Sequence, residues 1–191
     1  MASKLSLIQD GDILLYKPPA GISMEGAISV MEKDNTDSDK WDMYAHAGIV
    51  TNALNNQGYE QNPPATHYTD LRGEPWDRID VWRLLPAPLK TLDVPRLRSY
   101  AAQHLGIPYP YGMIAKYLQA DIVGQHGLPG LAKWLDNLGP TTDPSHAVCS
   151  ATVCLALWSS VDLKFDGQLW TKPCDEMRPC DIPLGMVTQI A

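Results

Sequence analysis

The sequence predicts a single α+β domain, with one antiparallel sheet or partial barrel packed against helices. Three observations indicate this class. Short segments of period-two alternation fill the first half of the chain, helical spacing begins after Pro95, and no repeat, low-complexity tract or linker divides the 191 residues. A chain of this length can bury one substantial core. We therefore expect one domain over residues 1–191.

Apolar and polar residues alternate in several short segments, as they do in strands. In residues 44–50 the alternation places His46, Gly48 and Val50 on one face of a strand. Glycine, proline and asparagine end these segments, and the turn signal at residues 55–58 predicts a hairpin. We expect strands at residues 13–16, 44–50, 59–61 and 79–84, with closing extended segments at 181–184 and 186–188.

Helical spacing replaces this alternation after residue 95. Residues 97–105 carry an apolar stripe that Gly106 closes. Residues 148–158 are apolar almost all round, which indicates a buried helix. These patterns do not determine the structure of two inserted segments, at about residues 17–44 and 107–145. Within them we expect short helices at residues 24–32, 113–122 and 131–138.

The acidic balance of the chain limits its partners. The formal net charge is −7, and a negative surface repels phosphate backbones, so we expect no nucleic-acid partner. No apolar stretch approaches the roughly 20 residues that span a bilayer. The first residues lack a basic segment followed by a long apolar one. These features predict a cytoplasmic protein without an integral membrane segment, unless another route exports it or it is a virion component, and they leave the oligomeric state open.

All four cysteines lie in the last quarter of the chain, and only Cys149 has an activating context. It stands where a loop enters the buried helix, and the unpaired N–H groups of a first helical turn lower a thiol pKa. Cys154 is five residues on, about 140° around the helix, and is interpreted as a core residue. Cys174 and Cys180 lie in a proline-rich loop.

His46 is the candidate base for this thiol, because it is the histidine placed on a predicted strand and flanked by small residues. A histidine on a strand and a cysteine at a helix start are by themselves a weak signal. The other histidines lie in a polar connection, late in a helix, in a glycine-flanked loop and just before the cysteine: His67, His104, His126 and His146.

Several short motifs occur in a characteristic order along nearly the whole chain. They are Gly11-Asp12-Ile13, His46-Ala47-Gly48-Ile49-Val50, Tyr59-Glu60, Val81-Trp82-Arg83-Leu84, Gly106-Ile107-Pro108-Tyr109 and Cys149-Ser150. This order resembles the circularly permuted papain-like cysteine hydrolases of the NlpC superfamily, especially the YiiX/YaeF-like group. Lecithin retinol acyltransferase-like enzymes belong to the same branch. The resemblance implies a permuted papain-like fold, in which the sheet packs against a buried helix that bears the cysteine.

The resemblance also implies roles for particular residues. Cys149 matches the nucleophile and His46 its base, and the residue that orients the imidazole falls on the following strand. That strand offers Glu60 and Gln61, which point to opposite faces, and we favour Glu60 because a carboxylate stabilises the imidazolium. The oxyanion hole would use the Cys149 backbone N–H and a second donor. Asp12 is interpreted as a turn residue.

The activity implied is acyl transfer through a thioester, with a peptide or small molecule as substrate and no cofactor or metal. We favour an amidase or peptidase, acting on peptidoglycan-type or other peptide amides, because no long apolar anchor is present. An acyltransferase or thioesterase acting on lipids is the alternative within this class. Tyr109, Tyr111, Tyr117 and Trp134 either line the cleft or pack the inserted helices.

Two alternatives from other classes stay open. A zinc protein could use ligands from His146, Cys149, Cys174 and Cys180, although neither spacing is the compact Cys-x2-Cys usual in structural zinc sites. A catalytically inactive binding or virion-structural module would keep the fold without the reaction.

Overall fold

A computed structural model describes residues 4–18, 44–109, 148–162, 167–174 and 177–191 of the chain. The predicted short helices at residues 24–32, 113–122 and 131–138 lie outside this described part, as do most residues of the two inserted segments. Within the described part the class is α+β, as predicted, and the sheet is open rather than closed into a barrel.

The described strands are β1 (Ile13–Tyr16), β2 (His46–Asn52), β3 (Gln57–Asn62), β4 (Ala65–Asp70), β5 (Ile79–Leu84) and β6 (Val187–Gln189). The described α-helices are α2 (Pro86–Leu89), α3 (Val94–Gln103) and α6 (Cys149–Ser160). Short 3₁₀ helices complete this part of the chain: η1 (Lys4–Ser6), η2 (Ala53–Asn55), η3 (Leu71–Gly73) and η6 (Pro179–Leu184).

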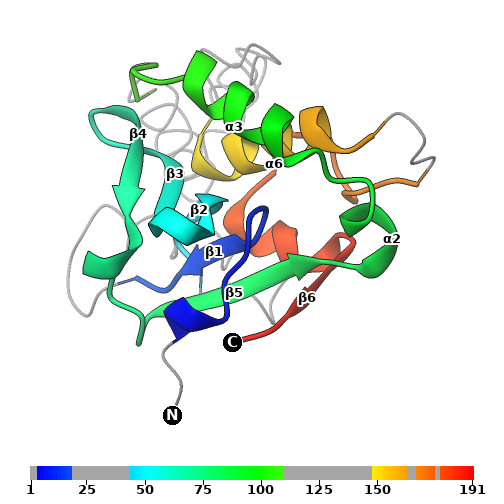
Figure 1. The fold of residues 1–191 in the computed structure, drawn as a ribbon, viewed down its shortest axis with the longest axis horizontal. Coiled ribbons are helices and arrows are strands. Elements are labelled where there is room, and N and C mark those ends of the chain that lie inside the picture. Colours follow the sequence, from blue (N-terminus) through cyan, green and yellow to red (C-terminus); the bar gives the residue numbers. More distant parts are fainter. Residues whose placement is uncertain (1–3, 19–43, 110–147, 163–166, 175–176) are drawn as a thin grey trace, which may run out of the picture.

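The strands form one sheet in the order β4-β3-β2-β1-β5-β6, and every neighbouring pair is antiparallel (Figure 1). β1 therefore lies in the interior of the sheet, between β2 and β5. The register places Tyr16 opposite His46 and Gly48 opposite Glu60. The two strands that flank β2 thus bring their side chains next to the histidine.

Alternation along the strands gives the sheet two apolar faces. On one face, Ile13, Ala47 and Ile49 share a buried cluster with Val153 and Leu157 of α6. Because both faces are covered, β1 and β2 are apolar at successive positions. The second face carries a smaller buried cluster formed by Leu14, Val50, Leu71, Ile79 and Val81.

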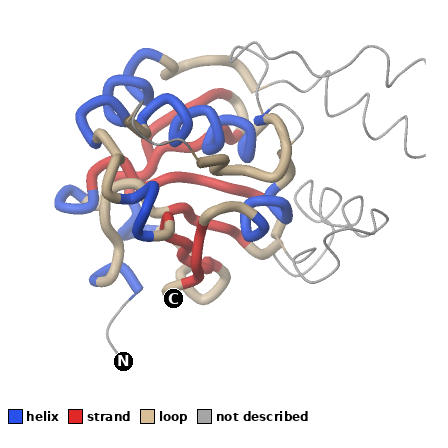
Figure 2. The backbone as a smooth tube through the Cα atoms, turned by 90° about the vertical axis from the view of Figure 1, so that its right-hand side faces the viewer, coloured by secondary structure: helices blue, strands red, loops and turns tan. Residues whose placement is uncertain are grey.

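α3 and α6 lie side by side over the sheet, and α6 contacts both β2 and β3 (Figure 1). In Figure 2, turned by 90°, helices lie above the strands, and shorter helical segments lie around them. Asp93 caps the start of α3, because its carboxylate accepts a hydrogen bond from the Arg96 N–H. α6 agrees with the helix predicted at residues 148–158, but Trp158 near its end is 56% exposed. The helix is therefore not buried all round.

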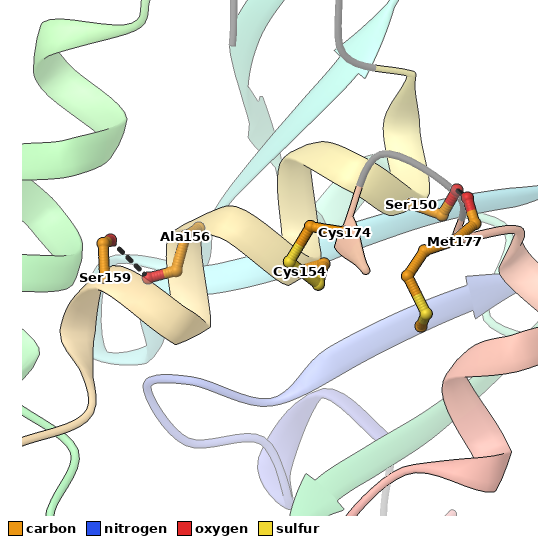
Figure 3. Close-up of a disulfide and its surroundings, with 6 residues drawn as sticks. All are labelled: Ser150, Cys154, Ala156, Ser159, Cys174 and Met177. Atoms are coloured by element: carbon orange, nitrogen blue, oxygen red, sulfur yellow. Dashed lines mark hydrogen bonds between the residues drawn. A yellow bond between two sulfur atoms is a disulfide. The ribbon is translucent and has the colours of Figure 1, made fainter. Parts of the chain in front are cut away.

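A disulfide bond joins α6 to the loop before η6 (Figure 3). It links Cys154, buried in the core as predicted, to Cys174, with 5.4 Å between the Cα atoms. One turn earlier on α6, the Ser150 hydroxyl donates a hydrogen bond of 2.6 Å to the Met177 carbonyl. The helix is thus fastened to this loop at two points close to its first turn.

Two local expectations were wrong. His67, expected in a polar connection, lies on β4, because each of residues 65–70 pairs with a residue of β3. Residues 181–184, expected to be extended, belong to the 3₁₀ helix η6. The buried Asp181 carboxylate stabilises that turn by accepting the Arg178 backbone N–H at 2.9 Å and pairing with Lys172.

Candidate active site

Cys149 is the first residue of α6, and its thiol is only 5% exposed. The N-cap residue, Val148, supplies no side-chain hydrogen bond. The free N–H groups of the first turn therefore point toward this end of the helix. Backbone N–H groups of Ser150 and Ala47 donate to the sulfur. The first pair between β2 and β3 is Gly48 opposite Glu60, and Ala47 comes directly before it. The sulfur therefore lies at the end of the β2–β3 pairing.

His46 is the first residue of β2, and its ring lies between the thiol and a carboxylate. The Nε2 atom is 2.6 Å from Oε2 of Glu60. The ring also forms a side-chain hydrogen bond with Cys149, which leaves Nδ1 as the nitrogen that faces the sulfur. Both ring nitrogens are therefore engaged, and the imidazole is oriented from both sides.

Glu60 has partners for both of its carboxylate oxygens. Oε2 binds His46, and Oε1 accepts a hydrogen bond from the Thr69 hydroxyl of β4. His67, also on β4, has its Nε2 3.8 Å from Oε1. Gln61 points elsewhere, donating its side-chain amide to the carbonyls of the 107–108 segment. Of the two candidates on this strand, the structure therefore brings only Glu60 to the His46 ring.

The charges of this site are strongly coupled. Burial alone would favour a neutral thiol, but His46 and the two backbone N–H donors outweigh it and lower the pKa of Cys149. Burial likewise disfavours the imidazolium, yet Cys149 and Glu60 outweigh it and raise the pKa of His46 to about 10. For Glu60, burial is outweighed by His46 and Thr69, and the carboxyl pKa falls. The favoured state is a thiolate–imidazolium pair beside a carboxylate.

Sequence reasoning missed several neighbours of the histidine. Tyr16 packs against the His46 ring, with 5.1 Å between the ring centroids, and its hydroxyl donates to the Glu74 carboxylate. Thr69 reaches Glu60 only because β4 exists. The β-branched and aromatic residues Thr66, Tyr68 and Thr69 were the signal that could have revealed this strand.

The remaining candidates take structural positions or lie outside the described residues. Asp12 is buried and forms a two-oxygen pair with Arg83, which fits a residue that holds a turn rather than a catalytic one. His104 stacks on Tyr100 and binds its carbonyl. Tyr109 is buried. The candidates outside the described part of the chain are Tyr111, Tyr117, His126, Trp134 and His146.

The zinc alternative loses one of its ligands, because the Cys174 sulfur is bonded to Cys154. Within the described residues, no group of three or more histidine, cysteine, aspartate or glutamate side chains is arranged to hold a metal ion. In the same part of the chain, no helix combines the length and apolar character needed to cross a membrane.

Comparison with known proteins assigns no class to this site. No family model, curated protein or solved structure gives a significant match to the chain. The functional assignment therefore rests on the chemistry of the residues that the fold brings together.

Proposed function

We propose that this protein is a cysteine hydrolase, an amidase or peptidase in which Cys149 is the nucleophile, His46 the general base and acid, and Glu60 the residue that orients the imidazole. One observation carries the proposal: a buried thiol at a helix N-terminus is hydrogen-bonded to a histidine whose other nitrogen lies 2.6 Å from a buried carboxylate. This is the arrangement that activates a thiol for nucleophilic catalysis.

In the first half of the reaction, the Cys149 thiolate attacks the carbonyl carbon of the substrate amide. A carbon–sulfur bond forms, and the carbonyl π electrons move to oxygen to give a tetrahedral oxyanion. The His46 imidazolium then donates its proton to the amide nitrogen, the carbon–nitrogen bond breaks, and the amine leaves. A thioester on Cys149 and a neutral imidazole remain.

In the second half, water releases the acyl group. Neutral His46 takes a proton from water as the oxygen attacks the thioester carbonyl. Collapse of this second tetrahedral intermediate breaks the carbon–sulfur bond, so the acid product departs and Cys149 leaves as thiolate beside the imidazolium. Glu60 keeps the ring in the orientation that serves both proton transfers, and its charge stabilises the imidazolium state.

The first turn of α6 is suited to stabilise the oxyanion. Cys149 is the first helical residue, and the first internal helical hydrogen bond runs from the Thr152 N–H to the Val148 carbonyl. The Cys149 N–H lies in the turn before that bond, at the positive end of the helix dipole. We assign it as one donor of the oxyanion hole.

A permuted papain-like fold is the architecture that we propose for this chemistry. It is supported by an antiparallel sheet packed on the cysteine-bearing helix, and by the order of the site along the chain, with the histidine strand preceding the cysteine helix. The resemblance of the sequence motifs points to the same architecture.

Trapping of the acyl-enzyme tests the proposed function without knowledge of the natural substrate. p-Nitrophenyl acetate should give a burst of p-nitrophenolate and an acetyl group on Cys149, located by peptide mass spectrometry. The Cys149→Ala variant should give neither. Acetylation that spares Cys149 in the folded wild-type protein would reject the assignment.

A further inference from the structure

A tyrosine packs against the catalytic histidine from the neighbouring strand. Tyr16 ends β1 and is the cross-strand partner of His46, with ring centroids 5.1 Å apart and planes inclined by 51°. Gly48 lies beside both groups: a β-carbon at that position would be in ordinary van der Waals contact, 3.6 Å from the Tyr16 ring and 3.5 Å from Cβ of Glu60. The tyrosine ring therefore lies against the same part of β2 as the His46–Glu60 hydrogen bond.

Glu74 holds this tyrosine from the other side. It directly follows η3, it is partly buried, and its carboxylate accepts the Tyr16 hydroxyl hydrogen bond. Its charge also interacts with those of Glu60 and His46. A second acid thus interacts with His46 through its charge and through Tyr16, from a different element of the fold than Glu60.

We propose that Tyr16 and Glu74 are positioning residues for the His46 base: the Tyr16 ring limits rotation of the imidazole, and the Glu74 carboxylate adds a second negative charge that stabilises the imidazolium. This inference rests on the proposed function. Neither residue touches the reacting atoms, so both act through His46.

Other charged groups around the histidine define how the pair responds to pH. The groups that interact with His46, directly or through a neighbour, are Cys149 from α6, Glu60 from β3, Tyr16 from β1, His67 from β4 through Glu60, and Glu74 with Arg78 from the segment before β5. Burial and repulsion by Glu60 raise the pKa of Glu74. Glu74 therefore loses its charge, and its support for the imidazolium, at a higher pH than an ordinary glutamate does as the solution is acidified.

The test is the titration of the His46 ring itself, followed by NMR of the full chain labelled with ¹⁵N in its histidine side chains. Glu74→Gln keeps an oxygen acceptor for Tyr16 and removes the charge, whereas Tyr16→Phe keeps the ring and removes the hydroxyl. Asp77→Asn is the matched control, because it removes the same charge from an exposed residue nearby. Thermal melts establish that each variant is folded.

We expect Glu74→Gln to lower the His46 pKa by about half a unit or more, and Tyr16→Phe to lower it by less, while Asp77→Asn leaves it unchanged. The alkaline limb of hydrolysis should shift by the same amount. An unchanged His46 pKa in Glu74→Gln, with a raised value in the wild type, overturns this inference and leaves the proposed function standing. A wild-type His46 that titrates at its ordinary value, with a Cys149 that forms no acyl-enzyme, overturns both.

Discussion

At the scale of single residues, the chemistry depends on a sulfur and an imidazole that the fold buries together. A buried thiolate is costly unless it is paired, and Cys149 is paired with His46 and with two backbone N–H groups. Each member of the pair therefore makes the other's charge possible. Removing either one should remove the reactive state.

We predict that Cys149→Ala and His46→Ala each reduce turnover by about 10³-fold or more, because neither residue can be replaced in the thioester route. Both variants should keep the near-ultraviolet circular dichroism and the cooperative melt of the wild type. Full hydrolytic activity in either folded variant would reject the assignment.

Glu60 should act through the protonation state of His46. Glu60→Gln keeps a side chain of the same shape but removes the charge, so kcat/KM should fall by about 10-fold or more and the alkaline limb of its pH profile should move to lower pH. Gln61→Met is the neighbouring control, because Gln61 binds the loop carbonyls and not the ring. An identical pH profile in Glu60→Gln would show that the carboxylate does not support the imidazolium.

At the scale of elements, α6 and the loop before η6 work as one unit. The Cys154–Cys174 disulfide closes a stretch with a sequence separation of 20, and Ser150 binds the Met177 carbonyl beside the reactive turn. Disulfides are typical of oxidising compartments and rare in the cytosol. This bond therefore argues against the cytoplasmic location that the sequence predicts. The location itself stays a prediction.

Removal of the disulfide should destabilise the fold. In the chain-entropy model, a loop of this size predicts that the Cys154→Ala, Cys174→Ala double variant loses about 3 kcal/mol of unfolding free energy. Urea unfolding measures the loss. Dithiothreitol should lower the stability of the wild type by a similar amount and leave the double variant unaffected. Equal stability of wild type with and without reductant would mean that the bond does not form in solution.

At the scale of the whole molecule, the sequence was sufficient for the elements with clear periodicity. Strand alternation identified β2 and β5, and the helix start singled out Cys149. The hairpin signal at residues 55–58 placed β3 beside β2, and the family resemblance pointed to that strand, and so to Glu60 or Gln61, for the residue that orients His46.

The rest depended on contacts between distant segments. Tyr16 reaches His46 only through the pairing of β1 with β2, and 29 residues separate those strands in the chain (17–45). The position of Glu74 near His46 and the Cys154–Cys174 bond also depend on tertiary contacts, which local sequence patterns do not predict. β4 was missed because its residues are mostly polar and only partly buried, so the segment resembles a connection.

The proton balance of the pair predicts the pH dependence of folding. In the folded state the pKa of His46 is raised to about 10 and the pKa of Cys149 is lowered, whereas unfolded histidine and cysteine titrate at about 6.5 and 8.5. The lowered pKa of Cys149 makes the contribution to stability rise with pH up to about 8.5, and the raised pKa of His46 makes it fall between about pH 6.5 and 10. The pair's contribution to stability should therefore rise, level off and then fall. Subtracting the unfolding free energy of a His46→Gln, Cys149→Ala double variant at each pH isolates this contribution; a difference that does not change with pH would contradict it.

The central claim is that Cys149 exists as a thiolate paired with His46, and its rate of alkylation by iodoacetamide as a function of pH tests this most directly. Peptide mass spectrometry assigns the rate to Cys149. Between about pH 6 and 8 the wild-type rate should be nearly constant, and His46→Ala should lower it by about 100-fold at pH 6, where an ordinary thiol is less than about 1% ionised. Because burial slows the reaction at every pH, the shape of the profile is the decisive result. A wild-type rate that simply rises with the midpoint of a free thiol, near pH 8.5, would contradict the account.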